Sequence, residues 1–194
     1  MVSNEKCAIT IANIEDLVKN MCDLAKEGSY APILEADVAG FLYHLMIKQG
    51  ICPINKIHLD TRIIGSQDNN ERFDLVIGNI EQRNDKRPAI SPEAVIEIKM
   101  FPNGFTSQAH RIHFDHILKD DLRKLGNISN TQSETVEFIF DEFNYLGGNY
   151  DGQNRKEVII NTRNKISPKT YLIFAIKIKG EWHTEKVEPN TNQK

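Results

Sequence analysis

The chain has few of the residues that mark disulfide-rich proteins, cysteine metal sites or membrane proteins. It contains three cysteines, Cys7, Cys22 and Cys52, with no Cys-x-x-Cys spacing, a pattern typical of reduced thiols in a cytoplasmic protein. No apolar run approaches the roughly 20 residues that a membrane helix needs. The first residues also lack the apolar core of a secretory signal. We therefore expect a cytoplasmic protein without a membrane partner.

Neither sign of charge dominates. The 194 residues include 24 Lys and Arg and 27 Asp and Glu, a net charge of −3, which argues against a protein that coats nucleic acid. The composition, 40% hydrophobic and 26% charged, is typical of a globular protein, and the length fits one domain. Within a single domain over residues 1–194 we expect four parts: an N-terminal helix (1–30), a core (31–143), C-terminal strands and loops (144–187) and a tail (188–194).

The spacing of apolar residues changes along the chain. Helical spacing predicts three helices, each followed by a glycine: 11–27, 31–49 and 107–125. Short apolar runs predict five strands: 54–64, 72–78, 93–100, 134–143 and 171–178. Residues 80–92 are predicted to be a polar loop, and 155–164 fits either a short helix or a strand. This order predicts an α/β fold of the α+β kind, a central mixed β-sheet flanked by helices.

Three ionisable residues stand inside two of these apolar runs. Asp74 lies in 72–78, and Glu97 and Lys99 lie in 94–100. Ionisable side chains are costly in buried strands unless they are paired or hold a metal. Glu97 and Lys99 are two residues apart, so on a strand they point to the same face. Asp74, on the preceding strand, could stand beside Glu97.

Two carboxylates and an ammonium group beside a sheet suit a divalent metal site for phosphodiester hydrolysis. Magnesium prefers few protein carboxylates, with waters and substrate phosphate oxygens completing its shell. Asp74, Glu97 and the backbone carbonyl of Ile98 are the expected ligands. The metal would polarise the phosphate and activate a water. Lys99 would orient or deprotonate that water, or neutralise charge in the transition state.

A further carboxylate precedes these strands. Glu35 falls in the first turns of the helix predicted over 31–49, from which it could reach the edge of the sheet and bind a metal. Asp37 and Glu93 are alternatives for the same position.

Together these residues resemble the PD-(D/E)XK nuclease superfamily, which includes restriction enzymes and Holliday-junction resolvases. The family pattern is a helix with a Glu, a hairpin with an Asp, and a strand with (D/E)-x-K followed by a helix; here these are Glu35, Asp74, Glu97-Ile98-Lys99 and 107–125. The resemblance covers about residues 31–143. Phe73 stands where the motif has proline, and the 23 residues from Asp74 to Glu97 make 80–92 an insertion.

The resemblance implies a restriction-endonuclease-like core and a Mg²⁺-dependent deoxyribonuclease, with Mn²⁺ able to replace Mg²⁺. Asp74 and Glu97 would be metal ligands and Lys99 the catalytic lysine. The partner would be DNA, and a homodimer would supply two sites for cutting a duplex. The alternative is a catalytically inactive protein that keeps this fold as a DNA- or protein-binding module.

The helix after the motif carries histidines at positions 110, 113 and 116. They could form a transition-metal site, although partly exposed helix histidines are the simpler interpretation. Four residues of this helix are candidate nucleic-acid contacts: His113, His116, Lys119 and Arg123.

Overall fold

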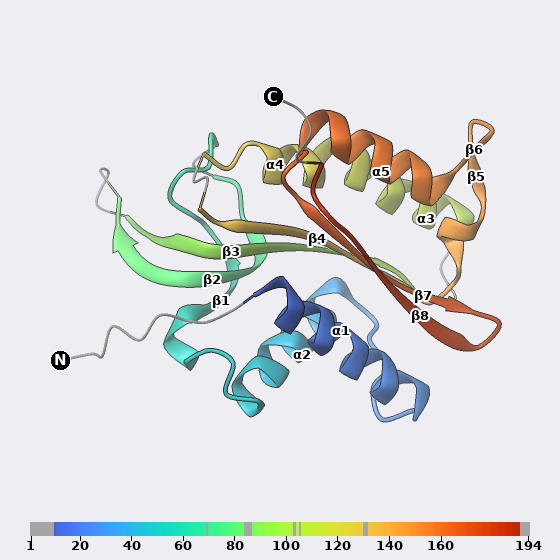
Figure 1. The fold of residues 1–194 in the computed structure, drawn as a ribbon, viewed down its shortest axis with the longest axis horizontal. Coiled ribbons are helices and arrows are strands. Elements are labelled where there is room, and N and C mark those ends of the chain that lie inside the picture. Colours follow the sequence, from blue (N-terminus) through green and yellow to red (C-terminus); the bar gives the residue numbers. More distant parts are fainter. Residues whose placement is uncertain are drawn as a thin grey trace.

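The computed structural model describes residues 10–68, 70–83, 87–102, 104, 106–129 and 132–190. Its centre is a six-stranded sheet with the order β1-β2-β3-β4-β7-β8 (Figure 1). The strands are β1 (Ile57–Thr61), β2 (Phe73–Gln82), β3 (Pro88–Phe101), β4 (Glu134–Asp141), β7 (Tyr171–Ile178) and β8 (Glu181–Val187). Strands β3, β4 and β7 are parallel, whereas β1, β2 and β8 join them by antiparallel pairing. The expected mixed sheet is confirmed.

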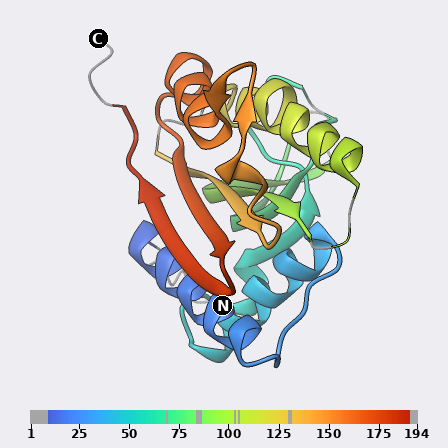
Figure 2. The same ribbon diagram turned by 90° about the vertical axis from the view of Figure 1, so that its right-hand side faces the viewer.

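Helices cover both faces of the sheet (Figures 1 and 2). One layer holds α1 (Ile11–Lys26) and α2 (Glu35–Lys48), and the other holds α3 (Ser107–His116), α4 (Leu122–Gly126) and α5 (Arg155–Ile166). A π-helical turn, η2 (Ile117–Asp121), joins α3 to α4. The remaining short elements are η1 (Ile54–Lys56), η3 (Tyr145–Gly147), β5 (Asn149–Tyr150) and β6 (Gln153–Asn154).

Strand β3 has the alternation that its sequence predicts. Ala94, Ile96, Ile98 and Met100 belong to the core cluster formed with α1 and α2. Val95 belongs instead to a cluster with Leu125 of α4. Glu97 also points to the α4 side of the sheet, where it pairs with Lys124.

The hairpin of β2 and β3 is longer than predicted. Of the loop predicted over 80–92, residues 80–82 and 88–92 are strand instead, because β2 continues to Gln82 and β3 begins at Pro88. The pairing shifts register between Ile77 and Gly78. A side chain at Gly78 would place its Cβ 2.1 Å from the carbonyl oxygen of Ser91, so the close approach of the two strands requires glycine. The apparent insertion is therefore an extension of the hairpin.

Helix α2 begins at Glu35, four residues later than predicted. Asp37 explains this start, because its Oδ2 accepts hydrogen bonds from the backbone N–H groups of Ile33 (2.9 Å) and Leu34 (2.8 Å). Glu35 is thus the first residue of the helix, and its side chain lies at the helix end nearest β3.

The C-terminal part decides between two expected alternatives and differs from one expectation. Residues 155–164 form a helix, α5, whose N-cap Asn154 accepts hydrogen bonds from the next turn. The first residues of the predicted tail, 188–190, are held in place, since the N–H of Asn190 donates to the carbonyl oxygen of Pro168 at 2.8 Å. Residues 191–194 lie outside the described residues.

The cysteines only partly follow expectation. Cys22 is a buried free thiol, and burial raises its pKa to about 12. Cys52 is disulfide-bonded, which contradicts the expectation of reduced thiols. Cys7 lies outside the described residues. Within the described ranges, no helix combines the length and the apolar character needed to cross a membrane.

Candidate functional site

The candidate site lies where strands β2 and β3 separate. Their pairing ends at Leu75 and Ile96, one residue from Asp74. Beyond that pair the N–H of Ile98 donates to Asp74 Oδ2 at 2.8 Å, so a side chain replaces the partner strand. This separation leaves the Glu97-Ile98-Lys99 segment accessible to side chains from both helical layers.

Lys99 is held between carboxylates from the two layers. Its Nζ lies 3.2 Å from Glu35 Oε1, at the start of α2, and 3.3 Å from Asp121 Oδ2, at the end of the π-helical turn. Only 12% of the Lys99 side chain is exposed. Burial alone would lower the pKa of Lys99, but the attraction of Asp121, Glu35 and Glu137 outweighs it and raises that pKa above the usual value.

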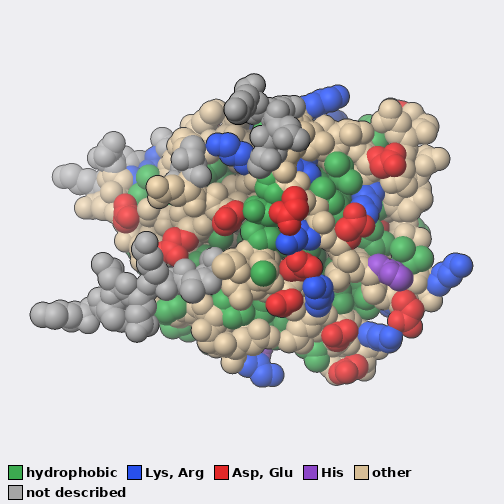
Figure 3. Space-filling model, viewed as in Figure 1, with side chains coloured by type: hydrophobic (Ala, Val, Ile, Leu, Met, Phe, Trp, Pro, Cys, Tyr) green, Lys and Arg blue, Asp and Glu red, His purple; other side chains and the backbone are tan. Residues whose placement is uncertain are grey.

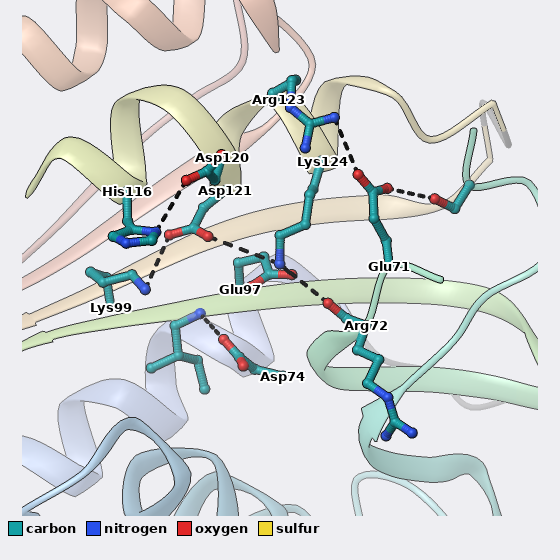
Figure 4. Close-up of polar contacts among 12 residues, drawn as sticks. Glu71, Arg72, Asp74, Glu97, Lys99, His116, Asp120, Asp121, Arg123 and Lys124 are labelled. Carbon is teal, nitrogen blue, oxygen red and sulfur yellow. Dashed lines mark hydrogen bonds and ion pairs between the residues drawn. The ribbon is translucent and has the colours of Figure 1, made fainter. Parts of the chain in front are cut away.

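Glu97 forms an ion pair with a second lysine, Lys124. Lys124 of α4 places Nζ 2.6 Å from Glu97 Oε1 and also donates to the carbonyl oxygen of Arg72 at 3.2 Å (Figure 4). The Glu97 side chain is only 3% exposed. Burial, followed by the repulsion of Asp74, raises the pKa of Glu97 well above its usual value despite the attraction of Lys124.

Glu137 of β4 is the most deeply buried carboxyl group of the site. It is the register partner of Glu97 in the parallel pairing of β3 and β4. Among the described residues neither of its carboxylate oxygens has a hydrogen-bond partner. Burial and then the negative charges of Asp121 and Glu97 raise the pKa of Glu137 well above its usual value.

The sequence predicted four of the seven charged residues at this site. Asp74, Glu97, Lys99 and Glu35 are brought together, whereas Asp121, Lys124 and Glu137 were missed. Two of these residues, Asp121 and Glu137, could have been found from the sequence, because each is a charged residue at a position where the pattern predicts an apolar one. Asp121 stands four residues from both Ile117 and Leu125, on the apolar stripe of its helix, and Glu137 lies between Val136 and Phe138. Lys124 had no such signal.

The two alternatives to Glu35 lie elsewhere. Asp37 is occupied with the backbone before α2, as described above. Glu93, near the middle of β3, pairs with Lys56 at 3.4 Å. Of the three carboxylates considered, Glu35 is the one that contacts Lys99.

The three histidines of α3 have separate surroundings. His110 is buried, with Nε2 3.0 Å from the carbonyl oxygen of Pro102. The ring of His113 places Nδ1 2.9 Å from the carbonyl oxygen of Met100 and 3.5 Å from Glu35 Oε1. His116 is exposed and pairs with Asp120 at 3.1 Å. A metal site shared by all three is therefore not formed.

The other predicted nucleic-acid contacts lie on the exposed side of the same helical segment. Lys119 pairs with Asp115 at 3.6 Å, and Arg123 with Glu71 at 3.2 Å. Acidic and basic side chains also lie side by side across the middle of the face drawn in Figure 3. Any nucleic acid would have to compete with these ion pairs.

A pocket of about 290 Å³ opens beside Glu35 and His113. Its other lining residues are mainly apolar and come from the start of α2 and the end of β3: Ile33, Leu34, Ala36, Met100 and Pro102. A mainly apolar pocket thus adjoins the charged site.

Comparison of the chain with protein-family models, curated proteins and solved structures finds no match. The family resemblance therefore depends on the residues and their placement alone.

Proposed function

We propose that this protein is a divalent-metal-dependent deoxyribonuclease that hydrolyses phosphodiester bonds, as its resemblance to the PD-(D/E)XK superfamily implies. The observation that carries the proposal is the convergence of Asp74, Glu97 and Lys99, with Glu35, where β2 and β3 separate. Strands β2 and β3 present the first three groups where their pairing ends, and Glu35 adjoins the pocket from which a substrate phosphate could approach.

The charge of the site favours a cation. Among the described residues, the site brings five carboxylates together with two ammonium groups, those of Lys99 and Lys124. The carboxylates are those of Glu35, Asp74, Glu97, Asp121 and Glu137. The raised pKa values of Glu97 and Glu137 reflect burial and then the negative charge of neighbouring carboxylates, which a bound divalent ion would relieve. Carboxylates are hard oxygen donors of the kind that Mg²⁺ and Mn²⁺ bind.

The arrangement is not a closed protein cage. In the described part of the chain, no three His, Cys, Asp or Glu side chains are grouped so that they could hold one metal ion. Magnesium often uses only one or two carboxylates, with waters and substrate phosphate oxygens in its other positions. Asp74 and Glu97 would supply those two ligands, and the carbonyl of Ile98 stays a predicted third.

The side chains have distinct tasks in this proposal. The bound metal ion would polarise the phosphate and lower the pKa of a coordinated water. Asp74 and Glu97 would hold that ion, and Glu35 would orient Lys99. Since two carboxylates keep Lys99 in its ammonium form, it would neutralise charge on the phosphate rather than accept a proton. His113, His116, Lys119 and Arg123 would contact the DNA backbone.

Cleavage assays test the proposal directly. Purified protein would be incubated with linear, supercoiled and branched DNA in Mg²⁺ or Mn²⁺, beside Lys99→Ala. Lys19→Ala is the matched control, because Lys19 is half-exposed and pairs with Glu15 of the same helix, in the α1/α2 layer. We expect metal-dependent cutting that Lys99→Ala loses and Lys19→Ala keeps. No cutting, with no stabilisation by metal, would instead favour the inactive binding module.

A further inference from the structure

The helix above β3 contains a π-helical turn at the point where it faces the site. Such turns are rare, and they frequently occur at functional sites. The turn ends at Asp121, whose side chain is 7% exposed, whereas that of the preceding Asp120 is 50% exposed. Of two consecutive aspartates, therefore, one faces solvent and the other faces the sheet. A buried carboxylate is costly unless it is paired, and Asp121 is paired with Lys99.

The charges on this helix complement those on the strand below it. The crossover from β3 to the parallel strand β4 carries the helix back against the direction of β3. Asp121 consequently lies over Lys99, and Lys124, three residues later, lies over Glu97, two residues earlier (Figure 4). Asp121 and Lys124 of the helix thus each face the strand residue of opposite charge, Lys99 and Glu97 respectively.

We propose that Asp121 is a positioning residue of the proposed reaction, which together with Glu35 fixes the ammonium group of Lys99 for the substrate phosphate. This inference rests on the nuclease function proposed above. The lysine side chain has high rotamer entropy, and a carboxylate on each side restricts it. Of the three N–H donors of this ammonium group, one donates to Glu35 Oε2 at 3.4 Å, and Asp121 is held as an ion pair. A donor is therefore left for a phosphate oxygen.

A chemical measurement tests the contact without any need for activity. Wild type, Asp121→Asn and Asp120→Asn would be reductively methylated in EDTA, and the modification of Lys99 would be compared with that of exposed Lys48 by mass spectrometry. Loss of Asp121 removes one of the two carboxylates that contact the Lys99 ammonium group and favour its protonated form. We expect Lys99 to react about tenfold faster in Asp121→Asn, as a tenfold larger deprotonated fraction would give, and at the wild-type rate in Asp120→Asn.

Cleavage kinetics then test the consequence. For Asp121→Asn we expect kcat to fall about 10–100-fold, with KM nearly unchanged. Asp121→Glu, which keeps the charge, would recover part of that loss, and Asp120→Asn would cut like wild type. Asp121→Ser, which also removes the carboxylate, replaces Asp121→Asn should the latter not fold.

The two proposals fail in different ways. If wild type cuts no DNA, the nuclease function is wrong, while the labelling of Lys99 still shows whether Asp121 holds it. If wild type cuts DNA but Asp121→Asn cuts equally fast, the positioning role is wrong. Slower cutting by Asp121→Asn with unchanged labelling of Lys99 also overturns the positioning role, because the loss of activity would then not act through Lys99.

Discussion

The ammonium group of Lys124 lies 2.6 Å from Oε1 of Glu97, a carboxylate that is almost wholly removed from solvent. The pair joins α4 to the middle of the sheet. It also compensates a buried charge inside a group of carboxylates, so each partner depends on the other.

Removing only the lysine of this pair should destabilise the protein. Lys124→Gln leaves Glu97 buried and uncompensated, and we expect the free energy of unfolding to fall by about 3 kcal/mol. The double variant Glu97→Gln/Lys124→Gln should recover most of that loss, because no buried charge remains. Urea unfolding in EDTA would measure both changes.

Lys119→Gln is the matched control for that experiment. Lys119 belongs to the same helical segment, but its side chain is 69% exposed, so its pair with Asp115 contributes little. If Lys119→Gln were as destabilising as Lys124→Gln, or if the double variant recovered nothing, the pair of Lys124 with Glu97 would not explain the effect.

A divalent cation should stabilise the folded chain. Binding at Asp74 and Glu97 would add about 2.7 kcal/mol at a metal concentration 100 times the dissociation constant. We expect Mg²⁺ and Mn²⁺ to raise Tm for wild type and not for Glu97→Gln. Glu93→Gln, the same change on the same strand at a residue paired with Lys56, should keep the full increase. An equal increase in Glu97→Gln would place the ion elsewhere.

Strand β3 shows how much of the site was predictable. Its alternation of apolar and ionisable residues predicts which side chains share a face, because successive side chains of a strand point to opposite faces. Asp74 and Glu137 break apolar runs in the same way, and both are at the site. These features are local, so the sequence contains them directly.

Other features depend on contacts between distant segments. The reach of Glu35 to Lys99 requires the separation of β2 and β3 and the late start of α2, which Asp37 sets through backbone hydrogen bonds. Lys124 looks like any exposed helix lysine until α4 is placed over Glu97. The strand ends over 80–82 and 88–92 were missed because their polar residues have little strand propensity, whereas pairing with each other stabilises them.

Two glycines should respond in opposite ways to alanine. Gly40 lies inside α2, where a Cβ would meet no atom within 4 Å, so Gly40→Ala should stabilise the protein by about 0.5–1 kcal/mol. Gly126 ends α4, and a Cβ there would lie 2.3 Å from the carbonyl oxygen of Ile166, at the end of α5. Gly126→Ala should therefore destabilise it by about 1–3 kcal/mol. Urea unfolding compares the two, and shifts of the same sign would contradict the packing of α4 on α5.

Glu137 should make stability depend on pH. Because its pKa is raised in the folded state, the folded chain binds this proton more tightly than the unfolded chain does. The free energy of unfolding should consequently fall as the pH rises from the ordinary carboxyl range through the raised pKa. Glu137→Gln removes the ionisable group and with it this fall. The variant should be more stable than wild type near about pH 8 and nearly equal to it near about pH 5.

Urea unfolding in EDTA at both pH values would measure this difference, with Glu134→Gln, at the exposed start of the same strand, as the control that shows none. A bound divalent ion offsets the negative charge around Glu137, so adding Mg²⁺ near about pH 8 should narrow the gap between Glu137→Gln and wild type. A variant less stable than wild type near that pH would instead mean that the Glu137 carboxylate is favourably paired in the folded protein. Stabilisation by the cation would then not come from relieving the cost of burying the Glu137 carboxyl group.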